Sequence, residues 1–309
     1  MTVETPEESP FARMRASLAE EYSAPTPGQM LRRRIVGNAG LMAGMIIFGL
    51  IVAMALLAPF ISPHDPYAQD LGNRLVPPFW QEGMTWEHVL GTDRLGRDYL
   101  SRIIYGSQIS LIIGIGTVII SGLIGSVLGI TAGYFGGRVD MVISYIITTR
   151  LAMPVVLVAL AVVAVVGASL QLVILVLGLL LWDQFAMVTR SATQQVRSQD
   201  FVAAAKAIGC SRTRLIFSEV LPNVMNPLIV VATLEMAHAI LLEAALSFLG
   251  LGVQPPLPSW GLMVAEAKPY MFFDAWIITL PGIALFMLVL SIYLIGDGLR
   301  DVTAPENRN

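Results

Sequence analysis

The sequence predicts an all-α integral membrane protein with six transmembrane helices. Of its 309 residues, 55% are hydrophobic and only 13% are charged, and the mean hydropathy is +0.71. Soluble domains carry about twice that charged fraction. Several apolar runs reach the length needed to cross a bilayer, which is roughly 18 residues or more. These runs can only be helical, because lipid offers no hydrogen-bond partner to free backbone groups.

Six apolar runs are the expected spans. They cover residues 37–61, 107–132, 139–166, 170–188, 224–251 and 276–295. Arg150 and Pro154 interrupt the third run, and we expect Pro154 and Pro281 to kink the third and sixth spans. Glycines in the second run predict close packing against a neighbouring helix; they occupy positions 114, 116, 122, 125 and 129.

The basic residues predict how the spans are oriented. If the N-terminus is cytosolic, the inner segments are 1–36, 133–138, 189–223 and 296–309. Together with Arg150 they hold 14 of the 19 Lys and Arg residues, and cytosolic loops are enriched in these residues. We therefore expect two cytosolic termini. The expected organisation is a tail at 1–36, a transmembrane domain at 37–300 with an outer loop at 62–106, and a tail at 301–309.

Composition and motifs also narrow the chemistry. The net charge of −3 is too small to indicate a nucleic-acid partner. A single cysteine, Cys210, excludes a disulfide within the chain. The phosphate-binding pattern G-x-x-x-x-G-K-[ST] does not occur, so we expect the chain itself to bind no ATP. We likewise expect no cofactor and no metal.

The polar stretch "FVAAAKAIGCSRTRLIFSEVLPN" at 201–223 predicts a helical hairpin, at 200–222, between two spans on the cytosolic side. Asp200 is a suitable N-cap for its first helix. Gly209 can end that helix in the left-handed conformation, and Ser211 can cap the second helix. Pro222 is expected to stop the second helix by forcing Leu221 out of helical geometry.

Such a hairpin needs a partner, because a helix shorter than about 12 residues is marginal alone. Its alanines give a smooth face that a groove on another protein can accept. The alternative is a solvated loop with helical propensity. A DNA-reading helix-turn-helix is excluded, because both ends of the hairpin enter the bilayer within a few residues and neither helix could reach a major groove.

The hairpin also resembles a known motif. "AAAKAIG", nine further residues and then "EVLPN" look like the EAA motif in the membrane subunits of ABC importers. Four more blocks occur in the right order: "HVLGTDRLGRDYLSRIIYG", "GYFGGRVD", "LLEAALSFLGLGVQPPLPSWG" and "LIGDGLRD". Over about residues 40–305 the chain resembles the inner-membrane permeases of the dipeptide/oligopeptide/nickel group, and among them the C-type partner of a two-permease pair.

The resemblance implies a type I ABC importer permease with the MetI-like fold, in a bacterial inner membrane. It implies a homologous second permease, two ATPase subunits that bind the ATP, and an extracytoplasmic solute-binding protein. The hairpin would be the element that couples to the ATPases. Its expected coupling residues are Asp200, Ala203, Ala204, Ala205, Lys206, Gly209, Arg212, Leu221 and Pro222.

The chain departs from the family pattern at several positions. Ala203 stands where the family usually has Glu, and Glu219 where it often has His. These two put the polar details of ATPase docking in doubt. Gln108 replaces a common Arg, and the segment 144–154 lacks the family's usual Met-Arg and Asp. The latter two fit a different partner permease or substrate branch.

The fifth span carries three ionisable residues, Glu235, His238 and Glu243. Ionisable groups at membrane depth are costly and often functional. They could line a hydrated translocation path; the alternative is a polar face that hydrogen-bonds to neighbouring helices at a subunit interface. Glu235 and His238 are too few to make a metal site.

On the outer side, Asp93, Arg97 and Trp260 are candidate contacts for the binding protein. The alternative for the charged pair is a solvated face with local salt bridges.

Two rival functions remain open from the residues alone. An intramembrane enzyme would need a nucleophile, a base and an orienting group; Ser247 with Glu243 and His238 is the constellation to consider, but it lacks a G-x-S-x-G setting. A self-contained secondary transporter would show internal repeats, and none is convincing. The substrate stays open among peptides, nickel chelates and other small solutes.

Overall fold

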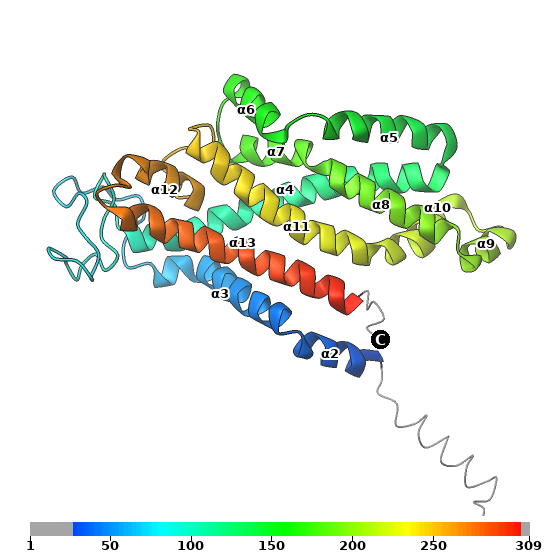
Figure 1. Cartoon of the computed structure of the whole chain (residues 1–309), viewed down its shortest axis with the longest axis horizontal. Coiled ribbons are helices and arrows are strands. Elements are labelled where there is room, and N and C mark those ends of the chain that lie inside the picture. The colour runs from blue at the N-terminus through cyan, green and yellow to red at the C-terminus, as the bar shows by residue number, and fades with distance from the viewer. Residues whose placement is uncertain (1–26, 304–309) are drawn as a thin grey trace, which may run out of the picture.

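The computed structural model describes residues 27–303, and within them the chain is helical, with one isolated bridge between Thr92 and Asp98. Figure 1 shows the helices as a bundle along one long axis. The elements are α2 (Pro27–Gly37), α3 (Ala39–Ile61), α4 (Tyr99–Phe135), α5 (Gly137–Leu151), α6 (Val155–Val166), α7 (Leu170–Leu180), α8 (Trp182–Arg197), α9 (Asp200–Ala207), α10 (Arg212–Arg214), the π-helical turn η1 (Leu215–Val220), α11 (Leu221–Phe248), α12 (Trp260–Ala267), the 3₁₀ turn η2 (Lys268–Tyr270) and α13 (Ala275–Thr303).

The expected spans match these helices. Five continuous helical segments are long and apolar enough to cross a membrane, and a bent pair of helices makes the sixth. The second span starts earlier than expected, at Tyr99, because the Asp98 side chain caps α4 by accepting a hydrogen bond from the Ser101 backbone N–H. The expected tails are partly helical: α2 occupies the end of the first and α13 runs to Thr303. The rest of both tails lies outside the described residues.

The third span is broken, as Pro154 predicts. Helices α5 and α6 meet at an angle of 81°, and Pro154 is the residue that precedes α6. Arg150 stabilises the bend, because its guanidinium donates to the backbone carbonyls of Met153 and Leu180. The sixth span differs from the third, since α13 continues past Pro281 as one helix.

Helices α4 and α11 form the centre of the bundle. Helix α4 packs against α3, α7, α8 and α11, while α11 also contacts α13 and α12. Glycines bring α4 close to α8, as the sequence predicts: a Cβ at Gly129 would lie 2.6 Å from the Ala186 carbonyl oxygen, and one at Gly125 would lie 2.9 Å from the Ala186 nitrogen. The same spacing continues at Gly133. This seam fixes the direction of α8, which leads into the hairpin.

The two ends of the bundle carry different structures (Figure 1). The loop that follows α3 lies at one end together with α12. The hairpin of α9 and α10 lies at the opposite end, as does α2. The expected coupling residues and the candidate contacts for the binding protein therefore lie at opposite ends of the molecule.

Candidate functional site

The hairpin joins two helices that pack against each other, α8 and α11. Helix α9 contacts both α8 and η1. The hairpin is attached through two buried side chains, Val202 on α9 and Leu215 at the start of η1, which are 4% and 2% exposed. The hairpin is therefore packed against the body of the bundle and is not a free loop.

The opposite face of the hairpin is open. Ala203, Ala204 and Lys206 are exposed, and Ala205 is half-buried. Three large apolar side chains of the hairpin and of η1 are also exposed, namely Phe201 at 44%, Ile208 at 82% and Phe217 at 64%. Arg212 and Arg214 are exposed nearby in sequence.

Gly209 has the conformation that the sequence predicts. Its φ is +86°, in the left-handed region, and no atom lies within 4 Å of a Cβ placed there. The Ser211 side chain caps the next helix, because its Oγ accepts a hydrogen bond of 3.3 Å from the Arg214 nitrogen. Gly209 thus sets the turn between the two helices by its backbone conformation alone.

Two local predictions for the hairpin are wrong. Gln199, and not Asp200, occupies the N-cap position of α9; Asp200 is the first residue of the helix. Pro222 does not stop the second helix, and Leu221 is helical with φ −55° and ψ −47°. A proline removes a backbone donor and crowds the preceding turn. The π-helical turn η1 accommodates this, since the Leu221 nitrogen bonds to the Ile216 carbonyl five residues back.

An ion pair braces the helix that enters the hairpin. Arg190 on α8 binds Asp140 on α5 with two hydrogen bonds, of which the one from Nη2 to Oδ2 measures 2.7 Å. Such a bidentate pairing fixes orientation as well as distance. It joins the segment "GGRVD" after α4 to α8, the helix that leads into the hairpin.

On α11, Glu235 and His238 form a pair one helical turn apart. His238 Nδ1 lies 3.5 Å from Glu235 Oε2, and the side chains are 44% and 9% exposed. The Glu235 Oε2 atom is buried without a hydrogen-bond partner. A nearby cleft between α11 and α13 is lined by Val230, Leu234, Tyr293, Leu294, Gly296, Asp297 and Arg300. Glu235 and His238 therefore remain candidates for a path or a subunit interface.

Glu243, by contrast, is enclosed within the chain. It is 1% exposed, and its Oε1 accepts hydrogen bonds from Ser247 at 2.7 Å and Ser259 at 3.0 Å. The Ser259 hydroxyl in turn caps α12 by accepting from the Leu262 nitrogen. Glu243 thus hydrogen-bonds to the loop that follows α11.

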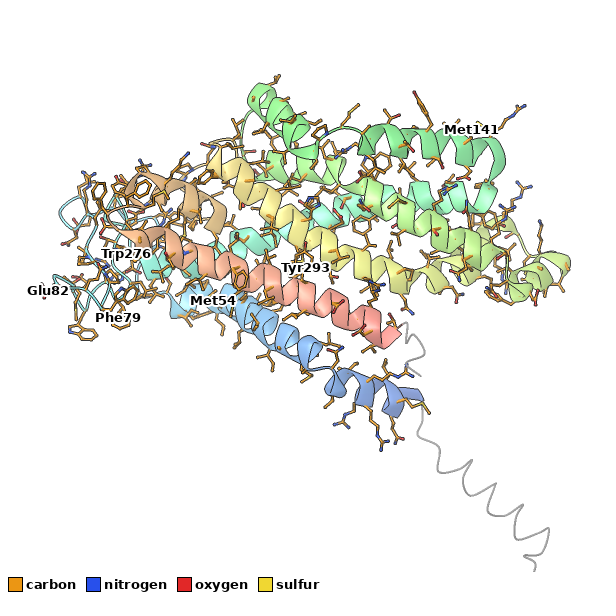
Figure 2. All side chains as sticks on the ribbon, in the orientation of Figure 1. Met54, Phe79, Glu82, Met141, Trp276 and Tyr293 are labelled. Atoms are coloured by element: carbon orange, nitrogen blue, oxygen red, sulfur yellow. The ribbon has the colours of Figure 1, made fainter. Side chains whose placement is uncertain are left out.

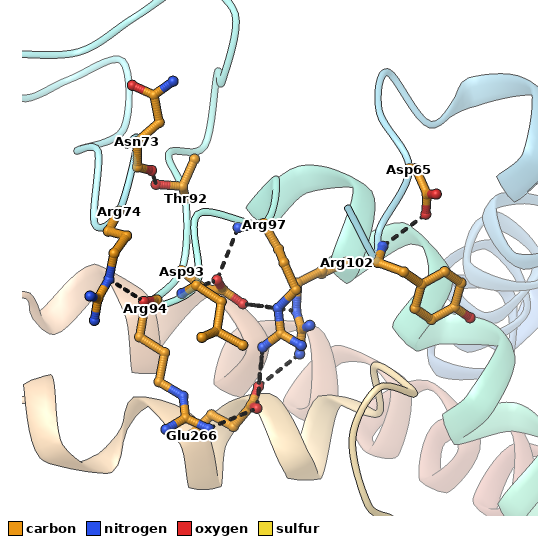
Figure 3. A network of polar contacts seen from close by, with 11 residues as sticks. Asp65, Asn73, Arg74, Thr92, Asp93, Arg94, Arg97, Arg102 and Glu266 are labelled. Carbon is orange, nitrogen blue, oxygen red and sulfur yellow. Dashed lines mark hydrogen bonds and ion pairs between the residues drawn. The ribbon is translucent and has the colours of Figure 1, made fainter. Parts of the chain in front are cut away.

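The outer end contains a buried ionic network (Figure 3). Arg97 donates from Nε to Asp93 Oδ2 at 2.6 Å, and from Nη2 to both oxygens of Glu266. Arg102 donates to the same Glu266 carboxylate at 2.7 Å. Arg94 lies 3.6 Å from it. The network ties the outer loop and the start of α4 to α12.

The three proposed contacts for the binding protein are all buried in this chain. Asp93 is 6%, Arg97 1% and Trp260 0% exposed. Trp260 donates from Nε1 to the Ile103 carbonyl at 2.9 Å, so it joins α12 to α4. These residues lie beneath the surface and support the loop and helix that form it.

The exposed outer surface carries aromatic side chains that the sequence analysis did not single out. Figure 2 shows Phe79 and Glu82 at the far outer end. The exposed aromatics of this region are Tyr67, Phe79, Trp80, Trp86, Phe272 and Phe273. A backbone turn positions this loop: the Gly72 backbone N–H binds the Asp70 carboxylate and holds its pKa below its usual value. The aromatic residues lacked a periodic pattern, which left them without a signal in the sequence.

Comparison with known proteins identifies the class. Residues 125–309 match the family model described as the inner membrane component of binding-protein-dependent transport systems. Residues 26–78 match the N-terminal transmembrane domain of oligopeptide transport permease C. The first match covers more than half of the chain, so the chain belongs to this family of transport-system inner membrane components. It is a multi-pass permease subunit of the ABC importer type, as its motifs indicate.

Relatives that match over more than 90% of both chains are also named as permeases. The chain is 42% identical to the di/tripeptide transport system permease protein DppC of Pseudomonas aeruginosa, with 92% of this chain and 94% of that protein covered. It is 39% identical to the dipeptide transport system permease protein DppC of Escherichia coli, with 91% and 94% covered. Among solved structures, an inward-facing MetNI methionine ABC transporter chain aligns with a TM-score of 0.55 at 18% identity, over 66% of this chain and 96% of that one. This likeness confirms the MetI-like fold.

Proposed function

We propose that the chain forms half of a translocation pathway for short peptides and couples it to ATP hydrolysis through the α9–α10 hairpin. The observation that carries the proposal is the two-sided hairpin. One side is anchored by Val202 and Leu215, and the other presents alanines framed by exposed Phe201 and Ile208. An apolar helical face of this kind suits a groove on a partner.

The proposed partners are those that the family of the chain implies. Two ATPase subunits would bind and hydrolyse ATP, one of them gripping this hairpin, and a homologous second permease would supply the other half of the pathway. Closure of the ATPases would displace the hairpin, and α8 and α11 would move with it because they are its two attachments. Since α11 carries Glu235 and His238, the movement would reach the candidate path directly.

Peptides are the proposed substrate class, because the relatives named above are peptide transport permeases. Selection would occur largely in an extracytoplasmic solute-binding protein that docks on the outer end. There the exposed aromatics Phe79, Trp80 and Trp86 offer contact surface. Both termini would be cytosolic in a bacterial inner membrane, as the basic residues indicate.

An intramembrane enzyme has little support. The Ser247 hydroxyl donates to Glu243, a buried carboxylate that also accepts from Ser259. Within the described residues, no hydrogen bond joins Ser247 to a histidine. The arrangement caps and fixes a loop, and it leaves the serine without a base oriented for nucleophilic attack.

The test is isolation through a tag on this chain. The expected result is co-purification with a second permease and two ATPase subunits, and peptide uptake in proteoliposomes only when ATP and a loaded binding protein are present. Uptake by the isolated chain without ATP would contradict the proposal and favour a secondary transporter. A peptide-independent hydrolytic activity of the isolated chain would favour an enzyme.

A further inference from the structure

Three side chains of the outer loop converge on one point. His64 follows the end of α3, His88 lies in the returning part of the loop, and Asp98 caps α4. Their ligand atoms all lie within 4.8 Å of one another. The chain contains three histidines, so two of them are in this cluster.

The two oxygens of the Asp98 carboxylate have different partners. Asp98 Oδ2 accepts hydrogen bonds from the backbone N–H and the hydroxyl of Ser101, at 2.8 and 2.6 Å. Its Oδ1 is hydrogen-bonded to His88 Nδ1 at 2.9 Å and lies 3.7 Å from His64 Nδ1. The helix cap therefore orients the carboxylate and leaves one oxygen directed at both rings.

His64 supplies an atom that the fold leaves unsatisfied. Its Nδ1 is buried and makes no hydrogen bond, and 3.7 Å to Asp98 is too long for one. The backbone of His64 is fixed, because its backbone N–H donates to Ser101 Oγ and its backbone carbonyl accepts from Ser62 Oγ. Buried polar atoms ordinarily have a partner, so the unpaired His64 Nδ1 indicates a ligand that would bind to it.

We propose that His64, His88 and Asp98 form a binding site for a divalent transition-metal ion of the Zn²⁺ type. Zn²⁺ binds nitrogen and oxygen ligands at about 2.0–2.2 Å in tetrahedral geometry, which places ligand atoms roughly 3.4 Å apart. The two measured separations, 2.9 and 3.7 Å, bracket that value. Two imidazoles and one carboxylate suit Zn²⁺, Ni²⁺ or Cu²⁺ and not Mg²⁺ or Ca²⁺.

The proposed ion would fasten the outer loop at both of its ends. It would join His64, three residues after the end of α3, to Asp98, the residue just before α4, and His88 would be its third protein ligand. Water would complete the coordination, since three protein ligands leave one tetrahedral position open. The site is separate from the hairpin and from Glu235 and His238, so it stands or falls independently of the proposed coupling.

The test uses the full-length chain in its complex, carried on a tag without histidine, stripped with a chelator and titrated with Zn²⁺. His64→Gln is the decisive variant, because His64 Nδ1 makes no hydrogen bond that the change could break. His238→Gln is the matched control. We expect one Zn²⁺ per chain in the wild type and the control, and a loss of affinity on the order of 100-fold in His64→Gln, since even outer-shell changes cost about 10–100-fold.

Two further readouts keep the result decisive. Co²⁺ should give the intense visible absorption of a tetrahedral site in the wild type and the control but not in His64→Gln. Hydrogen exchange in residues 62–98 should slow with Zn²⁺ in the same two proteins. If His64→Gln does not assemble, His88→Gln, which keeps a partner for Asp98, takes its place with the same expectation. Equal Zn²⁺ binding in the wild type and the ligand variant, or no binding in the wild type, would overturn the proposal.

Discussion

Arg102 at the start of α4 donates a 2.7 Å hydrogen bond from Nη2 to Oε2 of Glu266 on α12, across 164 residues of sequence. Arg97 donates to the same carboxylate. Both arginines are almost fully buried, at 0% and 1% exposure. Glu266 is thus the counter-ion that two buried guanidinium groups share, and it joins the outer loop to α12.

Replacing Glu266 by Ala should destabilise the outer end strongly. Removing one partner of a buried ion pair typically costs about 3–5 kcal/mol, and here the Asp93 carboxylate would be left to compensate two buried guanidinium groups. The measurement is thermal unfolding of the detergent-solubilised complex. Glu82→Ala is the control, since Glu82 is exposed at the far outer end (Figure 2). Equal melting temperatures for the two variants would mean that the network contributes nothing.

The glycine seam between α4 and α8 should be intolerant of side chains. A Cβ at Gly129 would lie 2.6 Å from a carbonyl oxygen of α8, so Gly129→Val must separate the helices. Overpacking of this kind costs about 1–3 kcal/mol. Gly49→Val on α3 meets no atom within 4 Å and serves as the control. We expect reduced yield and lower melting temperature for Gly129→Val alone; normal assembly of that variant would show that the two helices are not tightly packed.

Glu235 and His238 on α11 should be accessible to water in at least one transport state. We expect Glu235→Gln to reduce peptide uptake while the complex still assembles, because the carboxylate makes no hydrogen bond through Oε2. In a Cys210→Ser background, a cysteine at His238 should react with a water-soluble thiol reagent. A cysteine at Leu246, which is 1% exposed, should not. Protection of position 238 in every state would remove the basis for a path along this face.

Orientation can be tested with reporter fusions. Fusions after Gly83 and Pro256, both exposed, should report the extracytoplasmic side, and fusions after Arg197 and at the C-terminus should report the cytosol. Pro256 lies in the exposed part of the loop before α12, whereas Gly261 within α12 is buried and would not tolerate a fusion. Cytosolic activity of the Gly83 fusion would reverse the inferred topology.

Features that depend on local backbone chemistry were predictable from the sequence. Pro154 breaks the third span, Gly209 adopts a left-handed conformation and the glycines of α4 mark its closest helix contact. Each follows from what a proline or a glycine permits in its own turn of chain. Pro222 shows the limit, because a π-helical turn before it lets the helix continue.

Features that depend on distant residues were not predictable. The sequence placed Glu243 on a polar helix face, but its environment is set by Ser259 on the following loop. Trp260 was expected as a contact for the binding protein, yet it is buried and donates to the Ile103 carbonyl, 157 residues away. The convergence of His64 with Asp98 likewise requires the folded loop. A single sequence does not report which residues the fold brings together.

The central claim is that the hairpin couples ATP hydrolysis to transport, and Gly209 tests it most directly. A β-branched residue at φ +86° meets a steric cost of about 1–2 kcal/mol or more. No neighbouring atom lies within 4 Å of a Cβ there, so Gly209→Val should change the direction of the hairpin without a clash elsewhere. Gly209→Asn is the matched control, since Asn tolerates left-handed geometry better than other side chains. Restoring Glu at Ala203 should alter ATPase affinity only modestly.

The decisive measurement is ATP hydrolysis by the reconstituted complex, stimulated by the loaded binding protein, with peptide uptake followed in parallel. For Gly209→Val we predict normal membrane insertion and normal pairing with the second permease, but loss of the ATPase subunits or loss of stimulated hydrolysis and uptake. Gly209→Asn should retain most of both activities. Full stimulation and normal uptake in Gly209→Val would show that the hairpin is not the coupling element.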